Sequence, residues 1–141
     1  MSGYSDLVDG LKTVLESAIP GLHVYNHPVD GANDFPAAII LPEDLDMRIA
    51  FDGHTFDGSL RVVFLISAGG DTEDGFVQLY DYIDPTEANK SVVQAVRDDG
   101  NLDGKADSCD VTVIENIGRR AIWDGNYYGF DAVVEFVKTV A

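Results

Sequence analysis

The stretch LRVVFLISA at residues 60–68 is the most continuously apolar segment of the chain. Alternate side chains of an extended strand share a face, and one face of this stretch is wholly apolar: Leu60, Val62, Phe64 and Ile66. Val63 and Leu65 fall on the other face, with Arg61 beside them. Side chains that are apolar on both faces suit a strand that is covered on both sides. We therefore expect the central strand of a sheet here, with the other elements pairing beside it or packing over it.

Length and composition predict one folded domain over residues 1–141. Of the 141 residues, 45% are hydrophobic, and a chain of this size can bury a core without disulfide bonds. The single cysteine, Cys109, excludes an internal disulfide framework and fits a reducing compartment. We expect no membrane span, since no apolar segment approaches the roughly 20 residues that one needs, and no secretory signal.

The charge is strongly negative, with 9 basic residues against 25 acidic ones and a net charge of −16. Such a surface repels the phosphates of duplex DNA, which excludes a sequence-reading DNA-binding protein. Two interpretations stay open. The charge serves solubility, or it forms a surface that nucleic acid must pass without adhering.

The first half of the chain alternates between helical and extended patterns. Apolar residues at three- and four-residue intervals over residues 7–19 predict an amphipathic helix that Pro20 ends. Residues 22–25 predict a short strand. A strand over residues 36–41, flanked by prolines, is expected at an edge of the sheet, or with one hydrogen-bonding side free. Alternation over residues 46–51 predicts another strand, and residues 52–58 then turn back into the central strand as an antiparallel hairpin.

The second half predicts two helices followed by a β-hairpin. The first helix covers residues 76–83, and Asp84 and Pro85 predict the N-cap and first position of the next, which ends at residues 98–100. A strand from Val111 continues to residue 123 with a kink at Gly118, and the turn at residues 124–125 leads into a last strand. The predicted fold class is α+β: a mostly antiparallel sheet with an N-terminal helix and a central pair of helices packed on one face.

Residues 99–110, DGNLDGKADSCD, carry the sharpest local pattern. Oxygen-bearing side chains fall at positions 1, 3, 5, 9 and 12, with glycine at position 6, which is the spacing of a calcium-binding loop: Asp99, Asn101, Asp103, Asp107 and Asp110. Position 12 is aspartate where glutamate is usual, and a strand follows where a helix is usual. The alternative is a polar turn between a helix and a strand in an acidic chain.

No catalytic arrangement can be recognised in the sequence. His23 and His27 fall on a strand and loop, where their spacing does not form a helical metal pair, and His54 falls in a hairpin tip. Cys109 opens a strand and lacks the helix N-terminus that would activate a thiol. No glycine-rich loop carries the lysine of a phosphate site. We therefore expect no enzyme, no catalytic residue and no cofactor.

A protein-binding surface is predicted around the last hairpin. Tyr, Trp and Arg carry much of the energy in protein interfaces, and these types gather there in Arg119, Arg120, Trp123, Tyr127 and Tyr128. His54 and Phe56 in the earlier hairpin are further interface candidates. The alternative is a core edge closed by a turn.

The order of these parts resembles the tail terminator, or tail completion, proteins of long-tailed bacteriophages of actinobacteria. The chain has a helix ending in PGLxVY at residues 20–25, a proline-flanked strand PAAIILP at residues 36–42, and a double-helix segment DxxDPxEAxKSVxxAV at residues 81–96. A long hairpin precedes the double helix and a closing hairpin follows it. The resemblance spans nearly the whole chain.

This resemblance implies a structural virion protein without enzymatic activity. Proteins of that family form a six-membered ring at the head-proximal end of the tail tube, end tube polymerisation and meet the connector of the head. The expected partners are therefore copies of the chain, the tail tube protein and a head-completion or connector protein, assembled in the bacterial cytoplasm. Genome DNA would pass the acidic lumen without specific binding. A calcium-responsive protein-binding module that uses the 99–110 loop is the alternative function.

Overall fold

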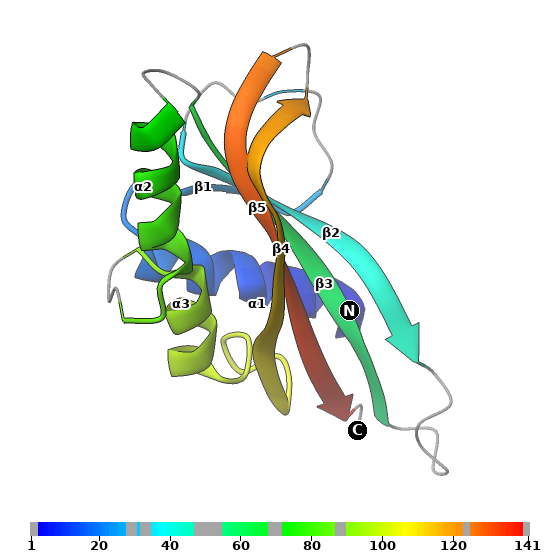
Figure 1. Cartoon of the computed structure of the whole chain (residues 1–141). Helices are drawn as coiled ribbons and strands as arrows, with labels where there is room; N and C mark the ends of the chain where they lie inside the picture. The colour runs from blue at the N-terminus through cyan, green and yellow to red at the C-terminus, as the bar shows by residue number, and fades with distance from the viewer. Residues whose placement is uncertain are drawn as a thin grey trace.

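A computed structural model of the chain describes residues 3–27, 31, 35–46, 55–67, 72–86, 90–122 and 125–139. Its elements are, in chain order, α1 (Gly3–Ala18), β1 (His23–Tyr25), β2 (Ala37–Asp46), β3 (Thr55–Ser67), α2 (Thr72–Ile83), α3 (Val92–Asp99), β4 (Ser108–Ile122) and β5 (Gly125–Thr139). The five strands form one sheet in the order β1-β2-β3-β5-β4, and the helices lie on one face of it (Figure 1). The predicted α+β class is confirmed. No helix in the described part of the chain has both the length and the apolar character to cross a membrane.

The predicted central strand is confirmed as β3. It pairs antiparallel with β2 on one side and, over its whole length, with β5 on the other. Its predicted apolar face is buried beneath the helices, where Phe64 packs against Phe130 with ring centroids 4.9 Å apart and against Tyr82 at 4.6 Å. The same core contains the predicted apolar stripe of α1, together with Ile19 directly after the helix: Leu7, Leu11, Val14, Leu15 and Ile19.

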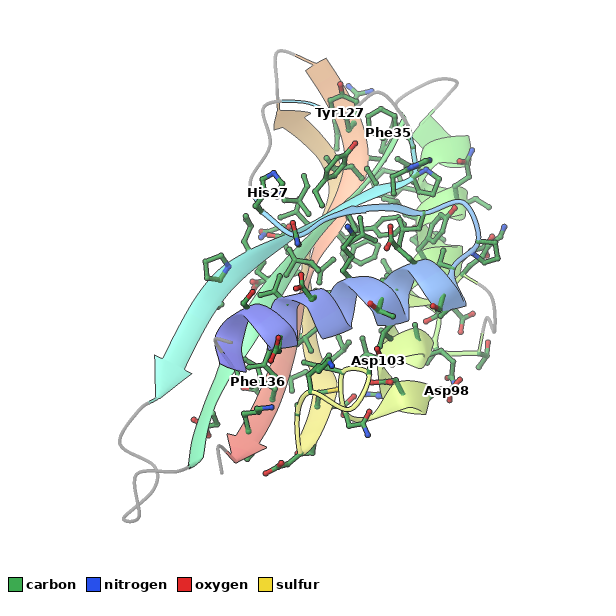
Figure 2. All side chains as sticks on the ribbon, turned by 180° about the vertical axis from the view of Figure 1, so that it is seen from behind. His27, Phe35, Asp98, Asp103, Tyr127 and Phe136 are labelled. Atoms are coloured by element: carbon green, nitrogen blue, oxygen red, sulfur yellow. The ribbon has the colours of Figure 1, made fainter. Side chains whose placement is uncertain are left out.

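The other face of β3 is buried as well, by a smaller cluster. Val63 and Leu65 pack with Ile39 there, and Phe35 stacks on Tyr127 at its margin with ring centroids 5.1 Å apart (Figure 2). The sequence-based expectation that both faces of this strand are covered is therefore confirmed.

The predicted course of β2 needs two corrections. The strand does not end at Pro42 but continues to Asp46, because a register shift between Pro42 and Leu45 absorbs the proline within the ladder. Nor is β2 an edge strand throughout, since β1 pairs with it in parallel at residues 37–39. Beyond Ile39 no described strand pairs on that side, as the flanking prolines indicate. Of the strand predicted over residues 46–51, Asp46 belongs to β2 and residues 47–51 lie outside the described residues.

The predicted start of the third helix is wrong. Its N-cap is Ser91, whose hydroxyl accepts a hydrogen bond from the amide of Gln94 at 3.1 Å, and α3 begins at Val92. The carboxylate of Asp84 instead accepts from the amide and hydroxyl of Thr86, at 2.9 and 2.7 Å, in the turn after α2. Asp84 closes a local turn because aspartate bonds its own backbone two residues on as readily as it caps a helix. The predicted end of the helix is confirmed at Gly100, in the left-handed conformation.

The long hairpin of β4 and β5 confirms the predicted kink. The ladder shifts register between Glu115 and Gly118, and both Asn116 and Gly118 have positive φ angles, 56° and 133°. Ile122 pairs with Gly125, so Gly125 belongs to β5 and the connection is residues 123–124, which lie outside the described residues. Opposite the kink, a Cβ atom on Gly129 would approach the carbonyl oxygen of Phe64 to 2.2 Å.

We predict that Gly129→Ala destabilises the fold by about 2–3 kcal/mol, because the added methyl overlaps the backbone of the central strand. Chemical denaturation followed by circular dichroism measures the change. The matched control is Gly31→Ala, at an exposed position with open space around it, which should stay within about 0.5 kcal/mol of the parent protein. Equal midpoints for the two variants would contradict the close approach of β5 to β3.

Candidate functional site

Arg61 organises a polar cluster on the face of the sheet away from the helices. Its guanidinium lies 2.6 Å from Glu43 of β2, 2.7 Å from Glu115 of β4 and 2.9 Å from Asp131 of β5. The amide of Asn116 donates to the same Asp131 oxygen at 2.9 Å. Together with β3, which carries Arg61, these residues come from four of the five strands.

The cluster is electrostatically tight and structural in character. The hydrogen bond from Arg61 holds the pKa of the Glu43 carboxyl below its ordinary value, and the bonds to Glu43, Glu115 and Asp131 raise the pKa of Arg61. Asp131 is only 4% exposed, so its charge requires this partner. With Nε, Nη1 and Nη2 all bound to carboxylates, Arg61 fastens four strands together. Sequence reasoning noted Arg61 in the apolar stretch but missed the cluster.

The acidic 99–110 loop uses its side chains to shape itself. The carboxylate of Asp99 accepts hydrogen bonds from the amides of Asn101 and Asp103, at 3.0 and 3.1 Å. Asn101 accepts from Gly104 at 3.0 Å, and Asp110 accepts from Arg97 at 2.9 Å. No group of three or more His, Cys, Asp or Glu side chains in the described ranges is arranged to hold a metal ion. The geometry therefore lends no support to the calcium interpretation of Asp99, Asn101, Asp103, Asp107 and Asp110.

The loop is anchored on α1 by Leu102, which is fully buried. The carbonyl of Leu102 lies so close to the helix that a Cβ atom on Gly10 would stand 2.1 Å from its oxygen. Leu102, Asp103 and Gly104 all have left-handed φ angles, 51°, 58° and 81°. A tight, anchored turn results, with Asp103 and Asp107 exposed.

The other chemistry-bearing residues are dispersed. His23 and His27 are exposed, and Nδ1 of His27 lies 2.9 Å from the side-chain oxygen of Asn26. His54 lies outside the described residues. Burial raises the pKa of the Cys109 thiol to about 11, which leaves it protonated at neutral pH and a poor nucleophile.

The predicted interface residues divide between the two faces of β5. Tyr128 points into the core beneath the helices, whereas Tyr127 belongs to the second cluster and stacks on Phe35 (Figure 2). The structure describes only the backbone of Arg120, opposite Tyr127, and of Phe56, opposite Lys138 near the far end of β5. Trp123 lies outside the described residues. The described side chains of Tyr127 and Tyr128 therefore do not share one surface.

Arg119 does belong to an exposed surface, which rests on Tyr128 and which α2 completes. The Arg119 guanidinium lies 5.7 Å from the ring centre of Tyr128, and Phe76 of α2 packs edge-on against the same ring with centroids 5.7 Å apart. Phe76 also neighbours Tyr80, at 6.3 Å. We call Phe76, Val77, Tyr80, Arg119 and Tyr128 the aromatic–arginine patch. Val77 is 53% and Tyr80 57% exposed, and Tyr128 lies beneath as the support.

Sequence reasoning missed the contribution of α2 to this patch. Residues 76–83 carry more apolar side chains than one buried stripe of a helix needs. In the structure, Leu79 alone of those described is fully buried, and the others reach the surface in part or in full. That excess was the available signal.

Comparison with known proteins found no match that could indicate the function of this chain. No protein-family model matches this chain, and no curated protein matches it either. The patch, the cluster around Arg61 and the acidic loop are therefore interpreted from their own geometry.

We predict that Arg61→Met destabilises the protein by about 2–3 kcal/mol at pH 7, because it removes the guanidinium that pairs with the buried carboxylate of Asp131. Chemical denaturation at several pH values measures it. Lys12→Met, which removes a cation from α1, is the control and should change stability by less than about 0.5 kcal/mol.

The loss caused by Arg61→Met should shrink in acid. The pKa of Glu43 is depressed in the folded state, so its pairing stabilises the fold above the ordinary value of 4.5 and is lost as the pH falls through the folded-state value. A loss independent of pH would show that Arg61 contributes packing alone.

We predict that Cys109 resists alkylation in the folded protein. A thiol with a pKa of about 11 should react with iodoacetamide at pH 8 on the order of a hundredfold more slowly than in the urea-unfolded chain, whose thiol is of the ordinary kind. Mass spectrometry over time follows the label. Similar rates in the two states would mean that the thiol is not held protonated in the fold.

Proposed function

We propose that this chain is a structural virion protein: a tail terminator that forms a ring at the head-proximal end of a phage tail tube, ends tube polymerisation and joins the tail to the head connector. The observation that carries the proposal is the order of parts along the chain, helix, proline-flanked strand, long hairpin, double helix and closing hairpin. In this protein the parts build a single α+β subunit.

The two sides of the sheet support head-to-tail assembly. Three successive antiparallel pairings separate β2 from β4, so these two strands run in opposite directions. The two edges of the sheet therefore differ in strand direction and in sequence. One side is formed by β1 and by the part of β2 on which no described strand pairs. The other side is formed by β4, where Val113 and Ile117 are 44% and 47% exposed. Closed rings form when a subunit joins two different faces to its neighbours.

The polar groups also favour a structural role over catalysis. Arg61 is bound by carboxylates, Asp99 and Asn101 bond to their own loop, and the Cys109 thiol is held protonated. The exposed aromatic–arginine patch, in contrast, has the residue types that dominate protein interfaces. A net charge of −16 suits a ring through which DNA slides without adhering.

Electron microscopy of the purified chain tests the proposal. We expect six-membered rings with a central channel, either free at high concentration or seated at one end of tail tubes when tube protein is added. Tubes grown with the chain should be shorter than tubes grown without it. Tubes of unchanged length with bare ends, together with the absence of rings, would overturn the assignment.

A further inference from the structure

We propose that the aromatic–arginine patch binds a second copy of this chain, and that its counterpart there is the acidic 99–110 loop. This inference rests on the proposed function, because it identifies the contact that joins neighbouring subunits. Each subunit would then bind one neighbour through the patch, near the turn of its β4–β5 hairpin, and the other neighbour through the 99–110 loop at the opposite end.

The patch has exposed apolar area around a cation that no carboxylate neutralises among the described side chains. Arg61 and Arg97 both pair with carboxylates, whereas Arg119 contacts the ring and the hydroxyl of Tyr128, the latter at 3.4 Å. Tyr128 thus holds the Arg119 guanidinium in place at an exposed position. Phe76 of α2 packs on the same Tyr128 ring, and Val77 and Tyr80 add exposed apolar area on that helix. A cation near exposed apolar area suits a protein partner that presents a carboxylate.

A second copy fits this requirement by charge. The chain carries 25 acidic residues against 9 basic ones, and residues 98–110 hold five aspartates and one lysine: Asp98, Asp99, Asp103, Lys105, Asp107 and Asp110. The loop is shaped in advance by its hydrogen bonds and by buried Leu102. A preorganised loop loses little conformational entropy when it docks.

Within one copy the two surfaces cannot meet. Arg119 stands 11 positions after Ser108 along β4, a span of roughly 35 Å for an extended strand. The 99–110 loop lies at the end of the sheet where β2 and β5 finish, and α2 lies toward the opposite end (Figure 1). Attraction between them therefore acts between copies, and it joins unlike faces, as a ring requires.

Extension of the sheet from one copy to the next is the less favourable contact. Through the ladder, Asp46 of β2 lies level with Ser108 of β4. A neighbour added in that register would bring the acidic end of β2, with Glu43, against the start of β4, with Asp110, and like charges across strands destabilise pairing. The patch and the loop avoid this repulsion.

Sedimentation of the full chain over a rising concentration series tests the contact. Arg119→Glu should weaken self-association by at least about tenfold, and Asp103→Asn should weaken it in the same direction while it keeps a residue type that tolerates the left-handed backbone. The controls are Lys12→Glu and Glu16→Gln, which change charge on α1 and should leave association within about twofold. Added salt should weaken the parent protein toward the Arg119→Glu level.

Zero-length cross-linking identifies the contacting groups. In an equal mixture of nitrogen-15-labelled and unlabelled Arg119→Lys protein, a carbodiimide should join the peptide that contains position 119 to the peptide of residues 98–110, in mixed-isotope form. Circular dichroism confirms that each variant is folded.

Each outcome decides between the two proposals. Monomeric parent protein at every concentration, association unchanged by Arg119→Glu, or no mixed-isotope cross-link between these peptides would overturn this contact. If Arg119→Glu protein still forms rings that cap tail tubes, the contact is wrong and the proposed function stands. If the parent protein self-associates through this contact but leaves tubes uncapped, the function is wrong and the contact stands.

Discussion

The structure depends on the burial of β3 on both faces and on the pairing of Arg61, the charged residue that this strand carries into the sheet. Leu60, Val62, Phe64 and Ile66 require the helices, whereas Val63 and Leu65 require a second apolar cluster on the opposite side. Arg61 lies on that second face, where an unpaired guanidinium would be costly. Carboxylates from β2, β4 and β5 meet it. Arg61, which interrupts the apolar strand, thereby links β2, β4 and β5 across the sheet. The hairpin of β4 and β5 carries the 99–110 loop at one end and Arg119 of the aromatic–arginine patch toward the other.

Local patterns in the sequence predicted the elements whose signal is local. A short run that is apolar on both faces identified β3, because a strand covered on both sides needs it. Period-3.6 spacing identified α1, because a helix buries one stripe. The start of α3 was predicted wrongly because Asp84 and Ser91 can both cap a helix. The sequence does not tell which of the two side chains accepts a hydrogen bond from the first backbone amides of the helix. The cluster around Arg61 joins residues up to 70 positions apart, so no window of sequence contains it. Tyr127 and Tyr128 were predicted to share a surface, although strand alternation places adjacent residues on opposite faces.

In the 99–110 loop the same residue spacing fits both a calcium site and a polar turn. The oxygen-bearing residues stand where a calcium loop has them, but the same oxygens satisfy backbone amides of the turn, and aspartate and asparagine do this readily. What separates the two outcomes is whether the backbone turns each carboxylate toward a common centre. Here Leu102 enters the core and the left-handed residues that follow it direct Asp103 outward. Hydrogen bonds within the loop and buried Leu102 shape an acidic projection, which in the proposed contact would meet the arginine of a neighbouring copy.

Copies of a chain with a net charge of −16 repel one another over long distances. Their association therefore requires short-range contacts of two kinds, apolar and electrostatic, whose free energy exceeds this repulsion. Apolar area provides the first part, since its contribution is independent of salt. In the proposed contact a cation over one aromatic ring provides the second part, because a well-placed arginine can turn a neighbour's negative surface from a repulsive element into a specific one. Few such cations are available among the 9 basic residues, and Arg61 and Arg97 are already paired within the fold. If the proposed contact forms, Arg119, exposed and over the ring of Tyr128, supplies the cation by which an acidic chain distinguishes a correct neighbour from a random encounter.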